Sequence, residues 1–332
     1  MNKLLLASSA VLAFGAAAPA LAADGNIVDG FGSFSAGYNE LNPGSSTYGG
    51  CEESSCGSST STNGVTANGL DLNARVTVAV PLGGAFGAQA DGEYSRTVYH
   101  ASDDGDSWTQ KLNDSTFAAH LFLRDPSKGL VGVVAQRTST NGNFGDGFAT
   151  YYLGGEAQAF VGRATVYGQL TYGSDDATVT DSNGINAKVE LRYFPQDNLK
   201  LALRGGYEFF KITPDARYNY CWADACSNKA NTVAIGANAE YRLAGSRVSV
   251  LGDVDYRAIK LKSRADYGAG DYEFSRQTAG DLRLMVGVKL NFGAGSLFER
   301  DRSGASLDPV RSLGQHVAAF GGGMSGPGFG DR

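Results

Sequence analysis

The sequence predicts an all-β protein, a single antiparallel up-and-down β-barrel of about twelve strands that spans a membrane. Segments of about ten residues alternate apolar and polar side chains, and the links between them alternate between short and long. The 332-residue chain is also rich in glycine (46) and poor in proline (8). After residue 22 no segment has the roughly 18 apolar residues of a membrane helix, whereas a tilted strand crosses a bilayer in about 9–11 residues. A closed barrel is the other way to pair every backbone amide and carbonyl within lipid.

The first 22 residues have the features of a secretory signal peptide. Lys3 gives a basic start, an apolar stretch follows, and residues 20–22 (ALA) match the small-residue cleavage pattern. The apolar stretch is short and is interrupted by serine and proline, which argues against a membrane anchor. We therefore expect residues 1–22 to be a leader and the exported chain to begin near residue 23.

Residues 23–292 carry the alternating pattern of the expected barrel. In the segment from Leu70 to Val80, apolar residues occupy every second position and Asp71, Asn73 and Arg75 lie on the other face. Such a period of two is typical of a strand with one face in lipid and one in a wet interior. The same pattern recurs at 116–124, 151–161, 165–172, 185–193, 199–208, 233–242, 248–257 and 281–292. Segments 29–40, 84–100 and 129–140 fit it less well and complete the count of about twelve.

The links between strands give a second test of the barrel. Short links are expected at 81–84, 125–129, 162–164, 195–198 and 244–246, and longer loops at 41–68, 101–114, 141–148, 174–182, 212–230 and 259–278. Membrane barrels have short periplasmic turns and long outer loops, and an even strand number places both termini on the periplasmic side. The alternative is an exported soluble β-sandwich, whose strands are usually shorter, at about 5–6 residues.

One motif at the end of the last expected strand sharpens this interpretation. Gly287, Leu290 and Phe292 match the spacing of the insertion signal of outer-membrane barrels, although Met285 stands where a polar residue is usual. With its strand pattern, the chain resembles the porin-like outer-membrane β-barrel superfamily of Gram-negative bacteria over about residues 29–292. The resemblance implies a location in the outer membrane, contact with outer-membrane lipid, insertion by the barrel-insertion machinery and passage of small polar solutes.

Forty residues follow the last expected strand, in contrast to typical porins, which end there. Residues 293–332 are glycine-rich and include the charged cluster 299–302. We expect a flexible periplasmic tail from this composition. The alternative is that the tail folds back into the barrel as a plug.

The candidate functional residues are the charged side chains expected to line the pore. Two neighbouring strands carry four basic residues, and two strands on the opposite side of a twelve-strand ring carry three acidic ones. These pore-lining candidates are Lys188, Arg192, Lys200 and Arg204 on one wall and Asp71, Asp91 and Glu93 on the other. Facing walls of opposite charge would place a transverse field across a narrow bore and favour polar solutes. The alternative is an interior filled by ion pairs, because twelve strands lie between packed eight-strand barrels and open sixteen-strand channels.

Four cysteines form two pairs with the same spacing, Cys51 with Cys56 and Cys221 with Cys226, both in expected outer loops. An exported protein meets an oxidising compartment, so we expect disulfides, with pairing within each loop favoured over cross-pairing. A metal site is the weaker alternative because no histidine flanks either pair. We expect no metal and no other cofactor.

The sequence therefore predicts a passive channel for small polar solutes. The alternative is a non-conducting structural or surface-binding barrel that acts through its long outer loops. A net charge of −6 argues against a nucleic-acid partner. We expect no enzymatic activity and no catalytic residue; a hydrolase built on His120 is the weakest alternative, since catalytic triads are recognised by geometry and not by spacing.

Overall fold

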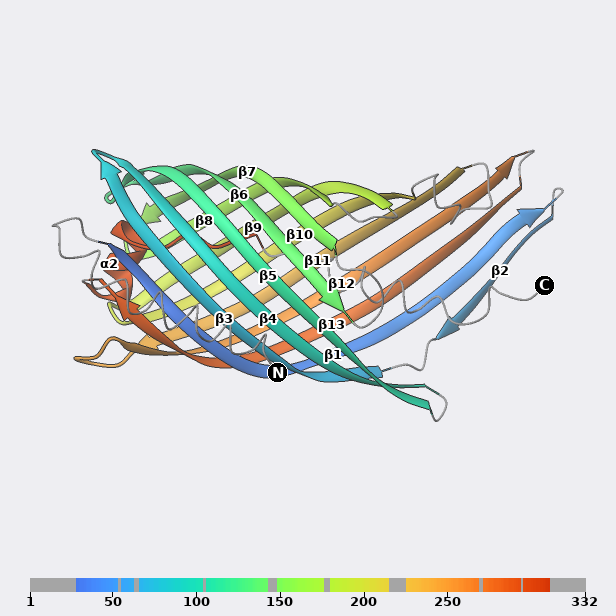
Figure 1. Ribbon diagram of the computed structural model, residues 1–332, viewed down its shortest axis with the longest axis horizontal. Helices are drawn as coiled ribbons and strands as arrows, with labels where there is room; N and C mark the ends of the chain where they lie inside the picture. Colours follow the sequence, from blue (N-terminus) through green and yellow to red (C-terminus); the bar gives the residue numbers. More distant parts are fainter. Residues whose placement is uncertain are drawn as a thin grey trace.

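The computed structural model describes residues 28–52, 55–62, 66–103, 106–142, 148–175, 180–214, 225–268, 271–293 and 295–310. These residues form one closed antiparallel barrel with a short helix at one end (Figure 1). The expected fold class, a single up-and-down barrel of twelve strands, is confirmed. The expected leader lies outside the described residues and stays a prediction.

The strands are long, and each pairs with its neighbours in the sequence. Their bounds are β1 Asp29–Glu52, β2 Ser55–Thr62, β3 Thr66–Gly83, β4 Phe86–Asp103, β5 Asp106–Asp125, β6 Gly129–Gly142, β7 Phe148–Val161, β8 Ala164–Asp175, β9 Thr180–Gln196, β10 Leu199–Pro214, β11 Ala225–Arg242, β12 Val248–Gly268 and β13 Asp271–Phe292. Helix α2, Leu297–Ser303, follows the last strand.

The barrel closes between its first and last strands. β1 pairs with β13 from Gly30 opposite Phe292 to Cys51 opposite Tyr272. On its other edge, the first half of β1 pairs with β3 and its second half pairs with β2. β2 and β3 therefore pair with different halves of the same strand, β1. The wall has twelve strands, although the described residues form thirteen strand segments.

The two faces of the wall differ as the alternation predicts. The outer face exposes large apolar side chains, such as Leu203 at 62% and Val286 at 70%, whereas inward Glu208 on β10 is 1% exposed. An apolar surface of this extent is unfavourable in water and favourable in contact with the acyl chains of lipid. Among the described residues, no helix is long and apolar enough to cross a membrane.

The short links are tight turns at one end of the barrel. Glycines with positive φ make several of them: Gly84 (58°), Gly162 (55°) and Gly245 (67°) adopt a conformation that residues with a Cβ disfavour. The long loops expected at 41–68, 101–114 and 259–278 are largely wrong, because strand pairing continues through them. β12 and β13 remain paired as far as Gly268 opposite Asp271. The pattern ended early because both faces of these extensions are polar.

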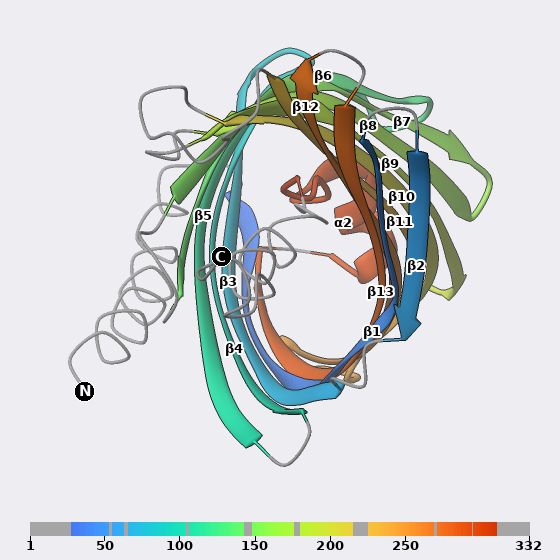
Figure 2. The ribbon, with the colours of Figure 1, turned by 90° about the vertical axis from the view of Figure 1, so that its right-hand side faces the viewer.

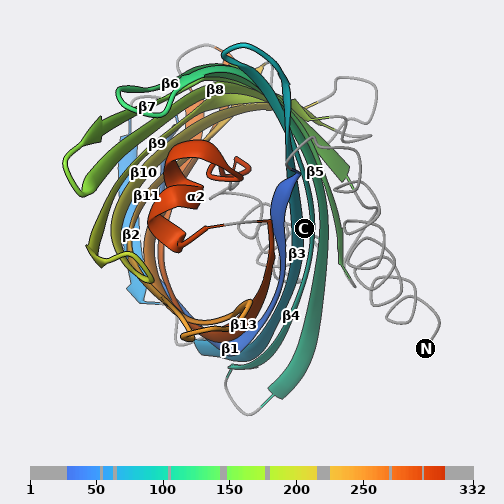
Figure 3. The ribbon, with the colours of Figure 1, turned by 90° about the vertical axis from the view of Figure 1, so that its left-hand side faces the viewer.

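The chain after β13 turns back into the barrel. Figures 2 and 3 look along the barrel from its two ends and show α2 inside the ring of strands. Residues 304–310 continue without helix or strand pairing, and most of their side chains are buried. The expectation of flexibility is therefore wrong for residues 297–310, which fill part of the lumen as the alternative of a tail folded back into the barrel predicts. The side of the membrane on which this end lies stays a prediction, and residues 311–332 lie outside the described residues. Polar side chains of the wall, which composition does not reveal, hold this segment in place.

Candidate functional site: the lumen and the segment within it

All seven charged residues expected to line the pore lie on the inward face. Each is buried or half-buried, while its neighbours along the strand point outward. Whether these residues line a conducting path stays a prediction.

The inward charged side chains form ion pairs with nearby strands and do not stand apart as two opposed walls of opposite charge. Arg283 Nε of β13 lies 2.5 Å from Asp71 Oδ2 of β3. Arg204 Nη2 of β10 lies 2.5 Å from Asp253 Oδ1 of β12. Lys200 Nζ lies 3.2 Å from Glu240 Oε2 on the adjacent strand. Because opposite charges alternate from strand to strand, much of the expected transverse field is neutralised locally.

Helix α2 is anchored where the barrel closes. Its N-terminus has a capping box, in which Ser296 Oγ accepts from the backbone N–H of Glu299 and the Glu299 carboxylate accepts from the backbone N–H of Ser296. From the buried side of the helix, Arg300 Nε donates to Asp29 Oδ2 at 3.1 Å, and the Arg300 guanidinium also donates to Asn291. The helix is therefore tied to the first residue of β1 and the penultimate residue of β13.

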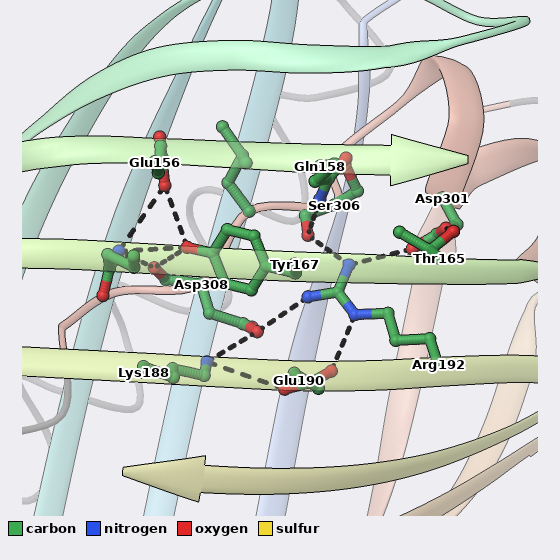
Figure 4. Close-up of polar contacts among 12 residues, drawn as sticks. Glu156, Gln158, Thr165, Tyr167, Lys188, Glu190, Arg192, Asp301, Ser306 and Asp308 are labelled. Carbon is green, nitrogen blue, oxygen red and sulfur yellow. Dashed lines mark hydrogen bonds and ion pairs between the residues drawn. The ribbon is translucent and has the colours of Figure 1, made fainter. Parts of the chain in front are cut away.

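Arg192 of β9 is the centre of the polar contacts between wall and segment (Figure 4). The side chain is 4% exposed, and its Nε donates to Glu190 of its own strand at 2.6 Å. Nη1 donates to Asp301 Oδ1 at 2.8 Å and to the backbone carbonyl of Ser306 at 2.7 Å, and Nη2 donates to Asp308 Oδ2 at 3.0 Å. A guanidinium suits this position because its planar fork presents several donors in fixed directions.

Asp308 bridges two sides of the lumen. Its Oδ1 accepts from Arg75 of β3 at 3.1 Å, and its Oδ2 accepts from Lys188 and Arg192 of β9, each at 3.0 Å. Burial alone would raise the pKa of Asp308, but the positive charges of Lys188, Arg192 and Arg75 lower it well below its usual range. Asp308 is therefore ionised in this position, and its carboxylate connects β3 with β9.

Glutamines of the wall bind the backbone of the segment. Gln89 of β4 accepts from the N–H of Leu307 at 3.1 Å and donates to its carbonyl at 2.7 Å. Gln136 of β6 does the same for Val310, accepting at 2.7 Å and donating at 2.6 Å. Gln169 of β8 donates to the carbonyl of Asp308 at 3.1 Å. Primary amides match the donor and acceptor of a peptide unit, so the wall satisfies the backbone much as a neighbouring strand would.

Two apolar contacts flank the carboxylate of Asp308. Leu307 packs in a buried cluster with Phe122, Leu130 and Tyr167. Val310 packs against Val134 and Tyr152, with Phe210 beside them. The segment is thus held by an apolar, an acidic and a second apolar side chain.

A cavity of about 150 Å³ remains beside the segment. Seven basic side chains of the strands line it, together with four acidic ones, and the segment itself adds Arg300, Asp301 and Asp308. The basic strand residues are Arg75, Lys188, Arg192, Lys200, Arg204, Arg283 and Lys289, and the acidic ones are Glu93, Glu190, Glu240 and Asp253. Five of the seven pore-lining candidates line this cavity, and the other two, Asp71 and Asp91, pair with the lining residues Arg283 and Arg75. The cavity is therefore a part of the bore in which a small polar solute could be accommodated.

His120 is held between two carboxylates on the inner wall. Its Nε2 lies 3.2 Å from Asp91 Oδ2 and its Nδ1 lies 2.7 Å from Glu156 Oε1, and the residue is 1% exposed. The imidazole thus contacts two acids and is closed off from the cavity. Among the described residues no group of three His, Cys, Asp or Glu side chains is placed to hold a metal ion.

The cysteine side chains are outside the described part of the structure. The backbone register places Cys51 of β1 directly opposite Cys56 of β2. Cys221 lies outside the described residues, and the side chain of Cys226 is not described either. Both disulfides therefore stay predictions, and the register is compatible with local pairing of the first two cysteines. Gly287, Leu290 and Phe292 lie on β13, whose last residue is Phe292, and their part in insertion also stays a prediction.

Known proteins resemble this chain in structure and not in sequence. No protein-family model matches it, and no curated protein matches its sequence. An outer-membrane channel from Pseudomonas putida F1 superposes with a TM-score of 0.53 at 12% identity, over 79% of this chain and 96% of its own. KdgM porin, in complex with disordered oligogalacturonate, gives 0.38 at 8% identity over 78% and 99%. The outer-membrane protease OmpT from Escherichia coli gives 0.33 at 9% over 79% and 97%. The first of these shows a shared barrel fold, and the other two scores are too low to carry an argument.

Proposed function

We propose that this protein is an outer-membrane channel, exported behind the leader 1–22, through which small polar solutes diffuse passively. One observation carries the proposal: a closed barrel with an apolar exterior encloses a polar interior that retains a cavity of about 150 Å³ beside residues 297–310. A polar lumen inside an apolar band is the arrangement of porins, in which inward side chains tune selectivity. The likeness to a protein named as an outer-membrane channel supports the same assignment.

Five of the seven predicted residues would act as polar lining. Lys188, Arg192, Lys200 and Arg204 reach the cavity from β9 and β10, and Glu93 reaches it from β4. Asp71 and Asp91 would act indirectly by holding Arg283 and Arg75 in place. We propose no enzymatic activity; in the described part of the chain, the histidine on the inner wall, His120, is enclosed by Asp91 and Glu156.

Recording from a planar bilayer tests the channel. Purified folded protein should give stepwise conductance in simple salts, and exchange of the cation or anion should shift the reversal potential according to the charge of the lining. Silence across a range of salt concentrations would exclude a channel of this kind.

The second candidate is a non-conducting barrel that acts through its outer end. The observation in its favour is that residues 297–310 and the ion pairs around them occupy much of one end of the lumen. This candidate predicts no conductance. It also predicts that trimming of residues 41–68 or 212–230, with the barrel still folded, abolishes a surface interaction.

A further inference from the structure

The inner wall that covers residues 304–310 has the properties of a peptide-binding site. We propose that this wall binds short extended peptides that carry a carboxylate between two apolar side chains, and that the chain's own residues 304–310 occupy the site as an internal ligand. The proposal rests on the proposed channel, because such peptides would reach the wall through the lumen.

The first argument is that the wall recognises a peptide backbone as such. Gln89 and Gln136 each bind both the N–H and the carbonyl of one residue, and these two residues, Leu307 and Val310, are three positions apart. Gln89 is 2% and Gln136 is 5% exposed. The segment itself covers both amides, and without it they would face the lumen and bind water, which a peptide backbone with the same donors and acceptors can replace. An extended peptide can supply those partners wherever the two residues that face the glutamines are not proline, because every other residue carries both an N–H and a carbonyl.

The second argument is that the wall holds a carboxylate pocket. Arg75, Lys188 and Arg192 each donate to the Asp308 carboxylate at 3.0–3.1 Å. Arg192 is fixed by Glu190 and Arg75 is fixed by Asp91, so neither guanidinium depends on Asp308 for its position. A preformed cluster of three cations accepts an anion at low cost in ordering, since the side chains are already immobilised.

The third argument concerns side-chain selection. The apolar pocket of Leu307 lies before the carboxylate pocket, and that of Val310 lies two positions after it. Between them stands Pro309, which has no N–H to satisfy and whose ring fixes φ at about −65°. The wall therefore selects the order apolar, acidic, proline, apolar, which is more specific than a general affinity for anions.

The fourth argument is that the occupant is connected in a way that permits release. Helix α2 has its own anchors, Arg300 to Asp29 and Asn291, and its own capping box. Residues 304–310 leave this helix at Gly304, and the N–H of Ala305 still shares Asp29 with Arg300. The contacts of residues 307–310 with Gln89, Gln136, Arg75 and Lys188 lie away from those anchors. The segment can therefore leave the wall while the helix stays in place, and the wall then becomes available to a peptide from outside.

The experiment uses a variant that ends after Ser303, folded in detergent, and isothermal titration with the capped peptide GASLDPV, which corresponds to residues 304–310. Three further probes complete it: the peptide GASLNPV, in which the carboxylate becomes an amide; succinate, which has carboxylates but no peptide unit; and the full-length chain titrated with GASLDPV. We expect the truncated barrel to bind GASLDPV, to bind GASLNPV roughly 10- to 100-fold more weakly because charge-assisted bonds are lost, and to bind succinate weakly at most. The full-length chain should bind GASLDPV far more weakly than the truncated barrel, because its site is filled.

Three results would overturn the proposal: no binding of GASLDPV to the truncated barrel, equal binding of both peptides, or binding of succinate as tight as that of GASLDPV. If the truncated chain does not fold, the full-length variant Asp308→Arg replaces it, because a fourth cation beside Arg75, Lys188 and Arg192 should expel the segment and leave the wall intact. Binding is measured here without conductance. If the protein binds the peptide but shows no conductance in a planar bilayer, the channel alone is refuted. If it conducts but does not bind the peptide, the peptide site alone is refuted.

Discussion

Replacement of Asp308 by asparagine should release residues 304–310 from the wall without unfolding the barrel. The carboxylate of Asp308 receives donors from Arg75, Lys188 and Arg192, at distances of 3.0–3.1 Å. Asparagine has the same size but no charge, and its NH₂ group would face cations. The strand pairing of the barrel does not involve this side chain, so the change should act on the segment alone.

The structure allows an estimate of the magnitude. Breaking one side of a buried ion-pair network typically costs about 3–5 kcal/mol. The side chain of Asp308 retains 24% exposure, so water can compensate part of this loss. We therefore expect about 2–3 kcal/mol, which would shift the equilibrium between docked and undocked segment by roughly 30- to 150-fold.

Hydrogen exchange of the backbone amides measures this shift. The N–H groups of Leu307 and Val310 donate to glutamine side chains and should exchange faster in the variant by that factor, while amides of the strands keep their protection. Asp197→Asn is the matched control: Asp197 accepts from Arg163 at 2.6 Å but is 61% exposed, so its loss should be worth less than about 1 kcal/mol. Unchanged exchange at Leu307 and Val310 in Asp308→Asn would refute the assignment of Asp308 as the main electrostatic anchor.

Three further predictions address the wall, the pH dependence and the closure of the barrel. Gln136→Ala removes both hydrogen bonds to Val310 and should speed hydrogen exchange of the Val310 amide about tenfold. The control, Gln196→Ala at the exposed end of β9, should leave this rate unchanged. Similar rates in the two variants would contradict recognition of the backbone by Gln136. The pKa of Asp308 is lower when the segment is docked than when it is undocked, so the contribution of Asp308 to docking is complete above the ordinary pKa of 3.8 and is lost as the pH falls towards the docked pKa. After correction for intrinsic exchange, the protection of amides 304–310 should be constant from pH 7 to pH 5. A loss of protection within that range would show that another group controls docking. Gly37→Ala would place a Cβ 2.5 Å from Met285 Sδ and closer still to the carbonyl of Leu284, so it should destabilise the pairing of β1 with β13 by at least about 1–3 kcal/mol. The control is Gly252→Ala, whose Cβ meets no atom within 4 Å. Urea titration of the folded band on a semi-native gel compares the two variants, and equal midpoints would contradict the register at the closure.

The barrel itself could be predicted from the sequence because its two environments repeat every second residue. In 199–208 and 281–292 most outer positions are apolar and every charged residue is at an inner position, and this contrast appears directly in the structure as exposed Leu203 and buried Glu208. The pattern fails where both faces meet water. The β12–β13 hairpin continues to Gly268 and Asp271, but its polar composition looks like that of a loop.

The site could be predicted only in part. The inward position of Arg192 follows from alternation, because its neighbours Leu191 and Tyr193 are apolar and exposed. Its partners do not follow, since Asp301 and Asp308 lie more than a hundred residues away in a segment whose composition suggests no order. The inward glutamines Gln89 and Gln136 were missed because uncharged amides give no charge pattern. Their spacing on separate strands becomes meaningful only once the barrel register is known.

Single-channel recording of the full-length protein beside the variant that ends after Ser303 tests the central claim most directly. A polar bore that residues 304–310 narrow predicts small stepwise conductance for the full chain and larger steps for the variant, with a greater preference for anions because Arg75, Lys188 and Arg192 lose the Asp308 carboxylate. Silence of both proteins, with folding verified by heat-modifiable gel mobility, would contradict an aqueous path through this barrel. Identical conductance and selectivity of the two would contradict the placement of residues 304–310 in that path.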